Sequence, residues 1–192
     1  KEMLDMSKSR GFLGILVCMM LLPAVASAES NSSRLNKERL EVGRALIEVT
    51  FDNVGSIIPY YADDIEYHDP IVDIYGIGEM TTFLFQLFGS TPDLITTVED
   101  EIAIDNIYTA TWTMVGTFAG VPYEAKGMSI AKFRDKTASV YYQRDYYTEG
   151  DIMINIEGLD QVVCGFRQFY RAAVDPVPNP DPKCTPPPGA PQ

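Results

Sequence analysis

Hydrophobic positions keep a helical spacing in the first part of the chain. Leu35, Leu40, Leu46 and Val49 fall roughly on one face of a helix over residues 34–52, and serines stand ahead of it as N-caps. Further along, the pattern predicts a short helix ending near residue 61, an extended segment over 65–69 and a helix over 78–88.

From residue 94 the hydrophobic period changes to two, which is typical of strands. Four segments rich in Thr, Val, Ile and Tyr are separated by turn residues, and they span residues 94–104, 107–118, 123–134 and 138–148. Long strands in direct succession favour an antiparallel meander. Residues 157–174 return to a helical spacing and predict a closing helix. Helices, then strands, then a helix predict an α+β domain with helices packed on one face of the sheet.

The two ends of the chain differ from this central domain. In the first 28 residues, Lys8 and Arg10 precede an apolar run over 11–22, and the small residues Ala26-Ser27-Ala28 follow it. This layout predicts a cleaved signal peptide over 1–28, with residues 1–5 upstream of the true start. The apolar run is shorter than the roughly 20 residues of a membrane span, which disfavours an uncleaved anchor. We therefore expect a periplasmic or secreted protein with no stable membrane span after cleavage.

Cysteine usage suggests how the proline-rich tail over 175–192 is held. Removal of the signal peptide leaves Cys164, in the last predicted helix, and Cys184, in the tail. Disulfides persist in an oxidising compartment, so the pair favours a bridge between tail and domain over two free thiols. His68 is the only histidine and no CxxC motif occurs, so we expect no metal site and no other cofactor.

Composition and charge limit the class of partner. Among 192 residues, 46% are hydrophobic, enough for the core of one domain over residues 29–174. The net charge is −12 and the sequence has no basic cluster. Nucleic-acid binding depends on Lys and Arg that neutralise phosphates, so this class of partner is excluded.

The chain resembles a known superfamily over about residues 35–150. The runs YYADDIEYHDPIVDIYG, GTFAGVPYEAKGMSIAKFRD and YYQRDYYTEGD occur in the order found in the nuclear transport factor 2-like superfamily, in particular its SnoaL-like polyketide cyclase and ketosteroid isomerase-like branches. The resemblance implies a cone-shaped, curved antiparallel sheet with the N-terminal helices on its concave face and a C-terminal helix. Such a cone encloses an apolar pocket for a small hydrophobic molecule.

The resemblance singles out three residues for catalysis. Asp69 lies where ketosteroid isomerase-like proteins carry a proton-moving carboxylate, and Asp145 lies where SnoaL-like cyclases and limonene epoxide hydrolase-like enzymes carry theirs. Tyr67 matches a tyrosine of the hydrolases' water-binding set. An apolar cavity raises a carboxyl pKa toward working pH, so either aspartate could serve as general base. As alternatives, Asp69 before Pro70 is a turn residue, and Asp145 pairs with a basic residue across the strands.

Strand alternation predicts which other side chains share the pocket. If Asp145 points inward, so do Tyr141, Gln143 and Tyr147. The resemblance adds Thr111 and Thr113, at positions where the epoxide hydrolases carry an Arg and an Asp, and Ser129, where ketosteroid isomerases carry a second aspartate. Ala45 stands where those isomerases carry a tyrosine.

The same alternation assigns Tyr108, Trp112 and Met114 to the outer face of the sheet. A large aromatic outer face is typical of a partner surface. Because members of the superfamily often dimerise sheet to sheet, we expect a homodimer through this outer face.

Three functions remain open at the level of sequence. The first is an enzyme that performs proton transfer on a small apolar molecule as an isomerase, cyclase or hydratase. The second is a non-catalytic domain that holds a hydrophobic ligand. The third is an interaction module whose pocket is filled by its own side chains. The fold alone does not choose among them.

Overall fold

The computed structural model describes residues 31–118, 120–174 and 182–184. The helical elements, including two short 3₁₀ turns (η), are α1 (Asn31–Ile47), α2 (Val54–Ile57), η1 (Ile58–Tyr60), α3 (Gly76–Ser90), α4 (Gly150–Met153), α5 (Leu159–Val174) and η2 (Pro182–Cys184). The strands are β1 (Tyr61–His68), β2 (Asp73–Tyr75), β3 (Ile95–Ile104), β4 (Ile107–Phe118), β5 (Val121–Phe133) and β6 (Val140–Tyr147). The predicted signal peptide and most of the predicted tail lie outside the described residues.

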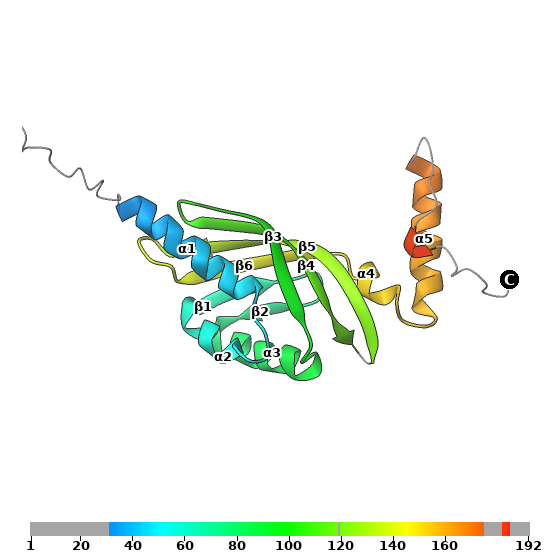
Figure 1. Cartoon of the computed structure of the whole chain (residues 1–192), viewed down its shortest axis with the longest axis horizontal. Coiled ribbons are helices and arrows are strands. Elements are labelled where there is room, and N and C mark those ends of the chain that lie inside the picture. The colour runs from blue at the N-terminus through cyan, green and yellow to red at the C-terminus, as the bar shows by residue number, and fades with distance from the viewer. Residues whose placement is uncertain (1–30, 119, 175–181, 185–192) are drawn as a thin grey trace, which may run out of the picture. The chain divides into compact units, whose positions relative to one another are not determined.

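The six strands form one curved, open sheet in the order β2-β1-β6-β5-β4-β3 (Figure 1). The predicted meander is present, because β3 to β6 pair antiparallel with their neighbours in sequence. The expectation of a purely antiparallel sheet needs one correction, since β1 pairs in parallel with β6. The predicted α+β class, with helices against a curved sheet, is confirmed.

Helices cover one side of this sheet. Helix α1 packs across β3, β4 and β5, and α3 packs on β1 and β2 (Figure 1). The close approach of α1 depends on Gly43, because a Cβ there would lie 2.4 Å from the ring of Tyr108 on β4. The core between helices and sheet includes Leu46, Ile65 and Phe88. The gap left between these packed elements becomes the cavity described below.

The inner and outer faces of β4 are the reverse of those expected. Ala110 pairs with Ser129, which pairs with Asp145, so these three residues share one face. Tyr108, Trp112 and Met114 follow Ala110 in alternation and point inward, with Tyr108 fully buried. Thr111 and Thr113 therefore point outward, and the prediction that they line the cavity is wrong. The turns between strands set the register, and their lengths do not reveal which alternate row faces the helices.

Strand β6 departs from simple alternation at Tyr141. Lys132 pairs with Tyr142 and Phe133 with Val140, so Tyr141 is an extra residue on its strand. Val140 and Gln143 consequently both point inward, although three positions separate them. The Tyr141 ring lies under the Arg134 guanidinium, 4.7 Å from it. The prediction that Tyr141 lines the pocket is wrong because of this bulge.

The C-terminal elements are joined by the predicted disulfide. Cys164 of α5 and Cys184 of η2 are bonded, with 5.4 Å between their Cα atoms. Arg167 of α5 and Lys183 of η2 both form ion pairs with Asp151 of α4. Helix α5 was expected to close the domain with an apolar stripe that includes Val163, Phe166, Phe169 and Tyr170. Val163 is buried, but Phe166, Phe169 and Tyr170 are exposed.

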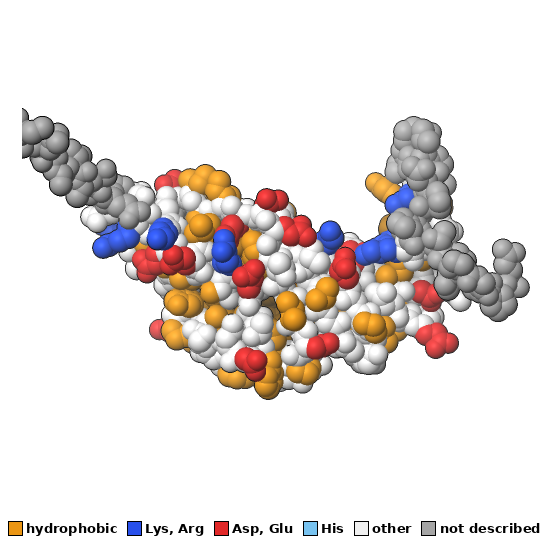
Figure 2. Space-filling model, in the orientation of Figure 1, with side chains coloured by type: hydrophobic (Ala, Val, Ile, Leu, Met, Phe, Trp, Pro, Cys, Tyr) orange, Lys and Arg blue, Asp and Glu red, His pale blue; other side chains and the backbone are white. Residues whose placement is uncertain are grey.

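Two surface properties bear on the expected partners. Figure 2 shows Lys and Arg side chains beside Asp and Glu along the α1 side of the face in view, so no extended basic patch occupies that side. In the described part of the chain, no helix is long and apolar enough to cross a bilayer.

Candidate functional site

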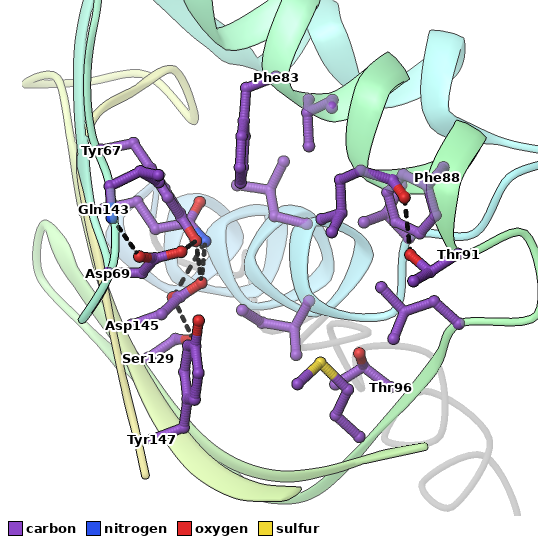
Figure 3. Close-up of a pocket in the computed structure, with 18 of the residues that line it drawn as sticks. Tyr67, Asp69, Phe83, Phe88, Thr91, Thr96, Ser129, Gln143, Asp145 and Tyr147 are labelled. Carbon is purple, nitrogen blue, oxygen red and sulfur yellow. Dashed lines mark hydrogen bonds between the residues drawn. The ribbon is translucent and has the colours of Figure 1, made fainter. Parts of the chain in front are cut away.

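A cavity of about 310 Å³ lies between the helices and the inner face of the sheet. Both aspartates of interest line it, so the hypothesis of a pocket filled by the protein's own side chains is wrong. Its walls are largely apolar, with Leu46, Met80, Phe83 and Leu84 from the helices among them. One group of polar side chains lies at one end of the cavity, and Phe88 and Thr91 lie away from it (Figure 3). The polar group comprises Tyr67, Asp69, Ser129, Gln143, Asp145 and Tyr147.

The carboxylate of Asp145 accepts hydrogen bonds from three side chains, and the Gln143 amide contacts both of its oxygens. Ser129 Oγ donates to Oδ1 at 2.6 Å, Gln143 Nε2 donates to Oδ1 at 3.2 Å, and the Tyr67 hydroxyl donates to Oδ2 at 3.0 Å. Ser129 reaches Asp145 because the two residues pair directly across β5 and β6. Tyr67 reaches it because β1 runs alongside β6 in parallel.

Two further side chains fix the direction of these hydrogen bonds. The Trp112 indole can only donate, and it donates to Ser129 Oγ at 2.8 Å, so the Ser129 proton points to Asp145. The Tyr61 hydroxyl donates to Gln143 Oε1 at 3.1 Å, which leaves the Gln143 amide nitrogen facing Asp145. The Asp145 carboxylate is therefore surrounded by donors that are already oriented toward it.

Burial and hydrogen bonding act in opposite directions on Asp145. Removal of water around the carboxyl raises the pKa of Asp145 above its ordinary value. The hydrogen bonds from Ser129, Gln143 and Tyr67 lower the pKa by a smaller amount, and the nearby negative charge of Asp69 raises it further. The net effect is a stronger base than an exposed aspartate.

Asp69 serves in a turn and also faces the cavity. Its Oδ1 accepts hydrogen bonds from the backbone N–H groups of Ile71 and Val72, both at 2.7 Å. Its Oδ2 lies 3.2 Å from the Tyr67 hydroxyl. Asp69 is therefore both a turn residue and a cavity-lining residue.

Tyr147 supplies a hydroxyl that is not used in this network. Its side chain lies next to Trp112, with 6.2 Å between ring centroids, and Figure 3 shows its hydroxyl pointing toward the Asp145 end of the cavity. In the described part of the chain, no hydrogen-bond partner contacts this hydroxyl. Burial, with the negative charges of Asp69 and Asp145, raises the pKa of Tyr147, so it remains a proton donor at neutral pH.

The structure brings together Tyr67, Asp69, Ser129, Gln143, Asp145 and Tyr147 from the predicted set. Thr111, Thr113 and Tyr141 lie elsewhere. Tyr61 was not predicted from the sequence, and Trp112 was predicted on the wrong face of the sheet. One signal for Trp112 is its partner across the strands, Gly127, because a Cβ at that position would lie 2.3 Å from the indole ring.

The cavity carries negative charge without a cation beside it. No Lys, Arg or His is found among the described residues that line it. Over residues 31–118, 120–174 and 182–184, no group of three or more His, Cys, Asp or Glu side chains is arranged to hold a metal ion.

Comparison with known proteins yields a family. The model of the SnoaL-like domain matches residues 46–141, half of the chain. This match covers most of the cavity-lining strands. No curated protein matches the sequence.

Solved structures share the fold at low sequence identity. A putative SnoaL-like polyketide cyclase from Jannaschia sp. is 16% identical, with a TM-score of 0.53 over 65% of this chain and 94% of its own. A limonene epoxide hydrolase-like enzyme from M. tuberculosis is 15% identical, with a TM-score of 0.55 over 67% and 96%. A hypothetical protein with a ketosteroid isomerase-like fold from Catenulispora acidiphila, in complex with trimethylamine, is 15% identical, with a TM-score of 0.53 over 62% and 91%.

Proposed function

The chain belongs to the SnoaL-like domain family, and we propose that its pocket catalyses proton transfer on a small, largely apolar molecule, with Asp145 as the general base. One observation carries this proposal: a buried carboxylate with a raised pKa stands at the polar end of an apolar cavity and is oriented by three donors. A base of this kind is effective near neutral pH because proton transfer is best served by a pKa close to the working pH.

The surrounding residues take distinct roles in this proposal. Ser129 and Gln143 hold the carboxylate in one orientation, since each is itself fixed by a donor behind it. The Tyr147 hydroxyl donates to an oxygen of the substrate that gains negative charge when a neighbouring C–H proton leaves. The apolar walls exclude water and leave room for a small ring system or a short branched chain.

A second candidate function is the storage or transport of a hydrophobic ligand without catalysis. The largely apolar lining favours it. Also in its favour, Ala45 and Ser129 occupy the positions where ketosteroid isomerases carry their strong donor pair. The two functions differ in whether a reaction depends on Asp145.

Kemp elimination of 5-nitrobenzisoxazole tests the base without knowledge of the natural substrate. A base removes the ring C–H proton of this probe, the N–O bond breaks, and a coloured cyanophenolate forms without help from an acid. We expect the protein to exceed an equal concentration of free acetate, and Asp145→Asn to lose roughly 10²-fold or more of the rate.

Asp100→Asn is the matched control, because Asp100 is an exposed carboxylate on β3. We expect this variant to keep the wild-type rate of Kemp elimination. Equal rates for wild type and Asp145→Asn, while both bind the probe, would reject the general base and favour the ligand-holding function.

We also infer that two copies of the chain associate through the outer face of the sheet. The support is an exposed apolar set on the strands, made up of Ile95, Ile102, Ile104, Ile107, Val115, Met128 and Tyr146. Tyr146 pairs directly with Met128, which makes their row a natural centre for an interface. Met128→Glu should give a monomer by analytical ultracentrifugation, and a wild type that is monomeric at high concentration would contradict the inference.

Export to an oxidising compartment is the third part of the proposal. It is supported by the Cys164–Cys184 bond and by the signal-like pattern of residues 1–28. N-terminal sequencing of the protein from a periplasmic or secreted fraction should begin at Glu29. A cytoplasmic protein with an intact first segment would be inconsistent with export.

A further inference from the structure

The hydroxyl of Tyr67 lies between two carboxyl groups. It is 3.0 Å from Asp145 Oδ2 and 3.2 Å from Asp69 Oδ2. A phenol has a single proton and can donate it to only one of them. If both carboxyls were ionised, the second close contact would set a hydroxyl lone pair against a carboxylate oxygen. The contact becomes favourable when one of the carboxyls is protonated and donates to Tyr67.

The other carboxyl oxygens cannot hold this proton without losing a hydrogen bond. Asp69 Oδ1 accepts from two backbone N–H groups, which are donors only. Asp145 Oδ1 accepts from Ser129, whose proton is directed there by Trp112, and from the Gln143 amide. The two Oδ2 atoms are the remaining positions, and both face the Tyr67 hydroxyl. Asp145 Oδ2 has one further, longer contact, from Gln143 Nε2 at 3.5 Å.

The side chains around the cluster of Asp69, Tyr67 and Asp145 leave its negative charge uncompensated. Helices α1 and α3 contribute apolar side chains here, among them Leu46, Met80, Phe83 and Leu84, and α4 contributes Ile152. The titratable side chains that face the cluster from the strands are the tyrosines Tyr61 and Tyr147. No Lys, Arg or His of the described lining neutralises a second negative charge, so a proton is the available means to do so.

We propose that Asp69, Tyr67 and Asp145 hold one proton in common and form a proton relay in which Asp69 is the acid that complements the base Asp145. In one state, Asp69 is protonated and donates to Tyr67, and Tyr67 donates to an ionised Asp145. In the other state, both hydrogen bonds are reversed. The relay rests on the proposed function, and it adds an acid and a route for the proton to return.

The relay gives a balanced catalytic cycle. Asp145 accepts a proton from a substrate C–H group, and the C–H electron pair moves into the adjoining π system. The Asp69 proton is delivered to a different atom of the substrate, which leaves Asp69 ionised and Asp145 protonated. Transfer from Asp145 to Tyr67 and from Tyr67 to Asp69 then restores the first state, so the protein gains and loses no proton overall.

This geometry points to a class of reaction. The two Oδ2 atoms flank one hydroxyl and are therefore at most about 6 Å apart. A substrate fits if it loses a proton at a carbon and gains one at an oxygen or carbon a few ångströms away. Double-bond isomerisation, enolisation and ring closure onto a carbonyl meet this condition. Reactions that consume or release water do not require it.

Titration of the free protein labelled with ¹³C at the aspartate carboxyls tests the shared proton. We expect the Asp145 signal to move in two steps, since the proton is removed from the pair rather than from one residue. In Asp69→Asn, the amide keeps the oxygen acceptor for the turn and offers N–H to Tyr67. Asp145 should then titrate in one step and at lower pH, because the nearby negative charge is gone.

Tyr67→Phe provides an independent check, since it removes the bridging hydroxyl and leaves both carboxyls. Only charge repulsion then couples the two carboxyls, so the two steps in the Asp145 signal should lie closer together than in the wild type. The relay is overturned if Asp145 in the wild type ionises in a single step near the ordinary aspartate value of about 4. In that case, a Kemp elimination that still depends on Asp145 would leave the proposed function standing.

Discussion

At the scale of single residues, Asp145 combines its proposed role as general base with a cost to stability. Burial raises its pKa in the folded protein above the value in the unfolded chain. At a pH below the pKa of the unfolded chain, the carboxyl is protonated in both the folded and the unfolded state and does not lower the stability. As the pH rises through the folded pKa, the unfolded chain ionises more readily, so the stability of the wild type falls.

Asp145→Asn should therefore be more stable than the wild type at pH 7 to 8, by about 1.4 kcal/mol for each unit by which the pKa is raised. Its amide can accept from Ser129 and Gln143 and donate to the Tyr67 oxygen, so the network persists. Urea denaturation at several pH values measures the effect. The difference should shrink toward pH 4, and a difference that grows there would contradict a pKa raised by burial.

A second residue, Arg39 of α1, holds two turns of the sheet. Its side chain is buried and donates to the carbonyls of Asp105, Thr137 and Arg134. Asp105 and Lys136, which precedes Thr137 in the chain, have left-handed backbone conformations, with φ of 53° and 60°. One guanidinium thus satisfies carbonyl groups in both the β3–β4 and the β5–β6 turn.

Arg39→Met should lower the free energy of unfolding by about 3 kcal/mol or more, because three hydrogen bonds from one buried guanidinium are lost. Arg34→Met on the same helix is the control, since Arg34 is exposed. Chemical denaturation of the two variants measures the difference. Equal losses in both would mean that the three carbonyl contacts contribute little.

At the scale of elements, the distance between α1 and β4 is set by Gly43. Gly43→Ala places a methyl group inside the Tyr108 ring and should destabilise the fold by roughly 1–3 kcal/mol. Gly89→Ala in α3 is the matched control, because a Cβ there meets nothing within 4 Å. This control should be stabilising by up to about 1 kcal/mol. Thermal unfolding measures both variants, and shifts of the same sign would show that Gly43 does not set the distance.

Elements were easier to predict from the sequence than their faces. The four long strands lie close to the predicted ranges, because β-rich segments and turn residues are local signals. The inward row of β4 and the bulge at Tyr141 depend on pairing between strands, which a single strand does not encode. Gln143, Asp145 and Tyr147 were placed in the cavity correctly, because they alternate along a single strand. Thr111 and Thr113 were misplaced, because the face they occupy depends on how β4 pairs with β5.

The parallel neighbour of β6 was also beyond local signals. Residues 61–68 show no feature that names β6 as their partner, yet this pairing carries Tyr67 to Asp145. The superfamily resemblance placed Tyr67 and both aspartates in one pocket. The way in which one hydroxyl bridges two carboxyls depends on side-chain positions that no sequence pattern encodes.

At the scale of the whole molecule, the disulfide ties η2 to α5 rather than joining parts of the sheet. Replacement of Cys164 and Cys184 by Ser should therefore raise amide hydrogen exchange in α5 and leave β4 and β5 protected. The free energy that opposes local unfolding of α5 should fall by about 3 kcal/mol, given the 20-residue separation of the two cysteines. Hydrogen-exchange mass spectrometry separates the regions, and lost protection across the sheet would contradict this local role.

The parallel β1–β6 pair also bears on the order of folding. The hairpins of the meander close short loops, whereas Tyr67 and Asp145 are 78 positions apart. Contacts of such long sequence separation form late, because more chain entropy must be lost before they contribute. The meander can therefore assemble while β1 is still unattached. We therefore expect the buried carboxyl cluster to form after the hairpins of the meander, so a chain in which β1 has not yet paired with β6 would have most of the sheet but no carboxyl cluster.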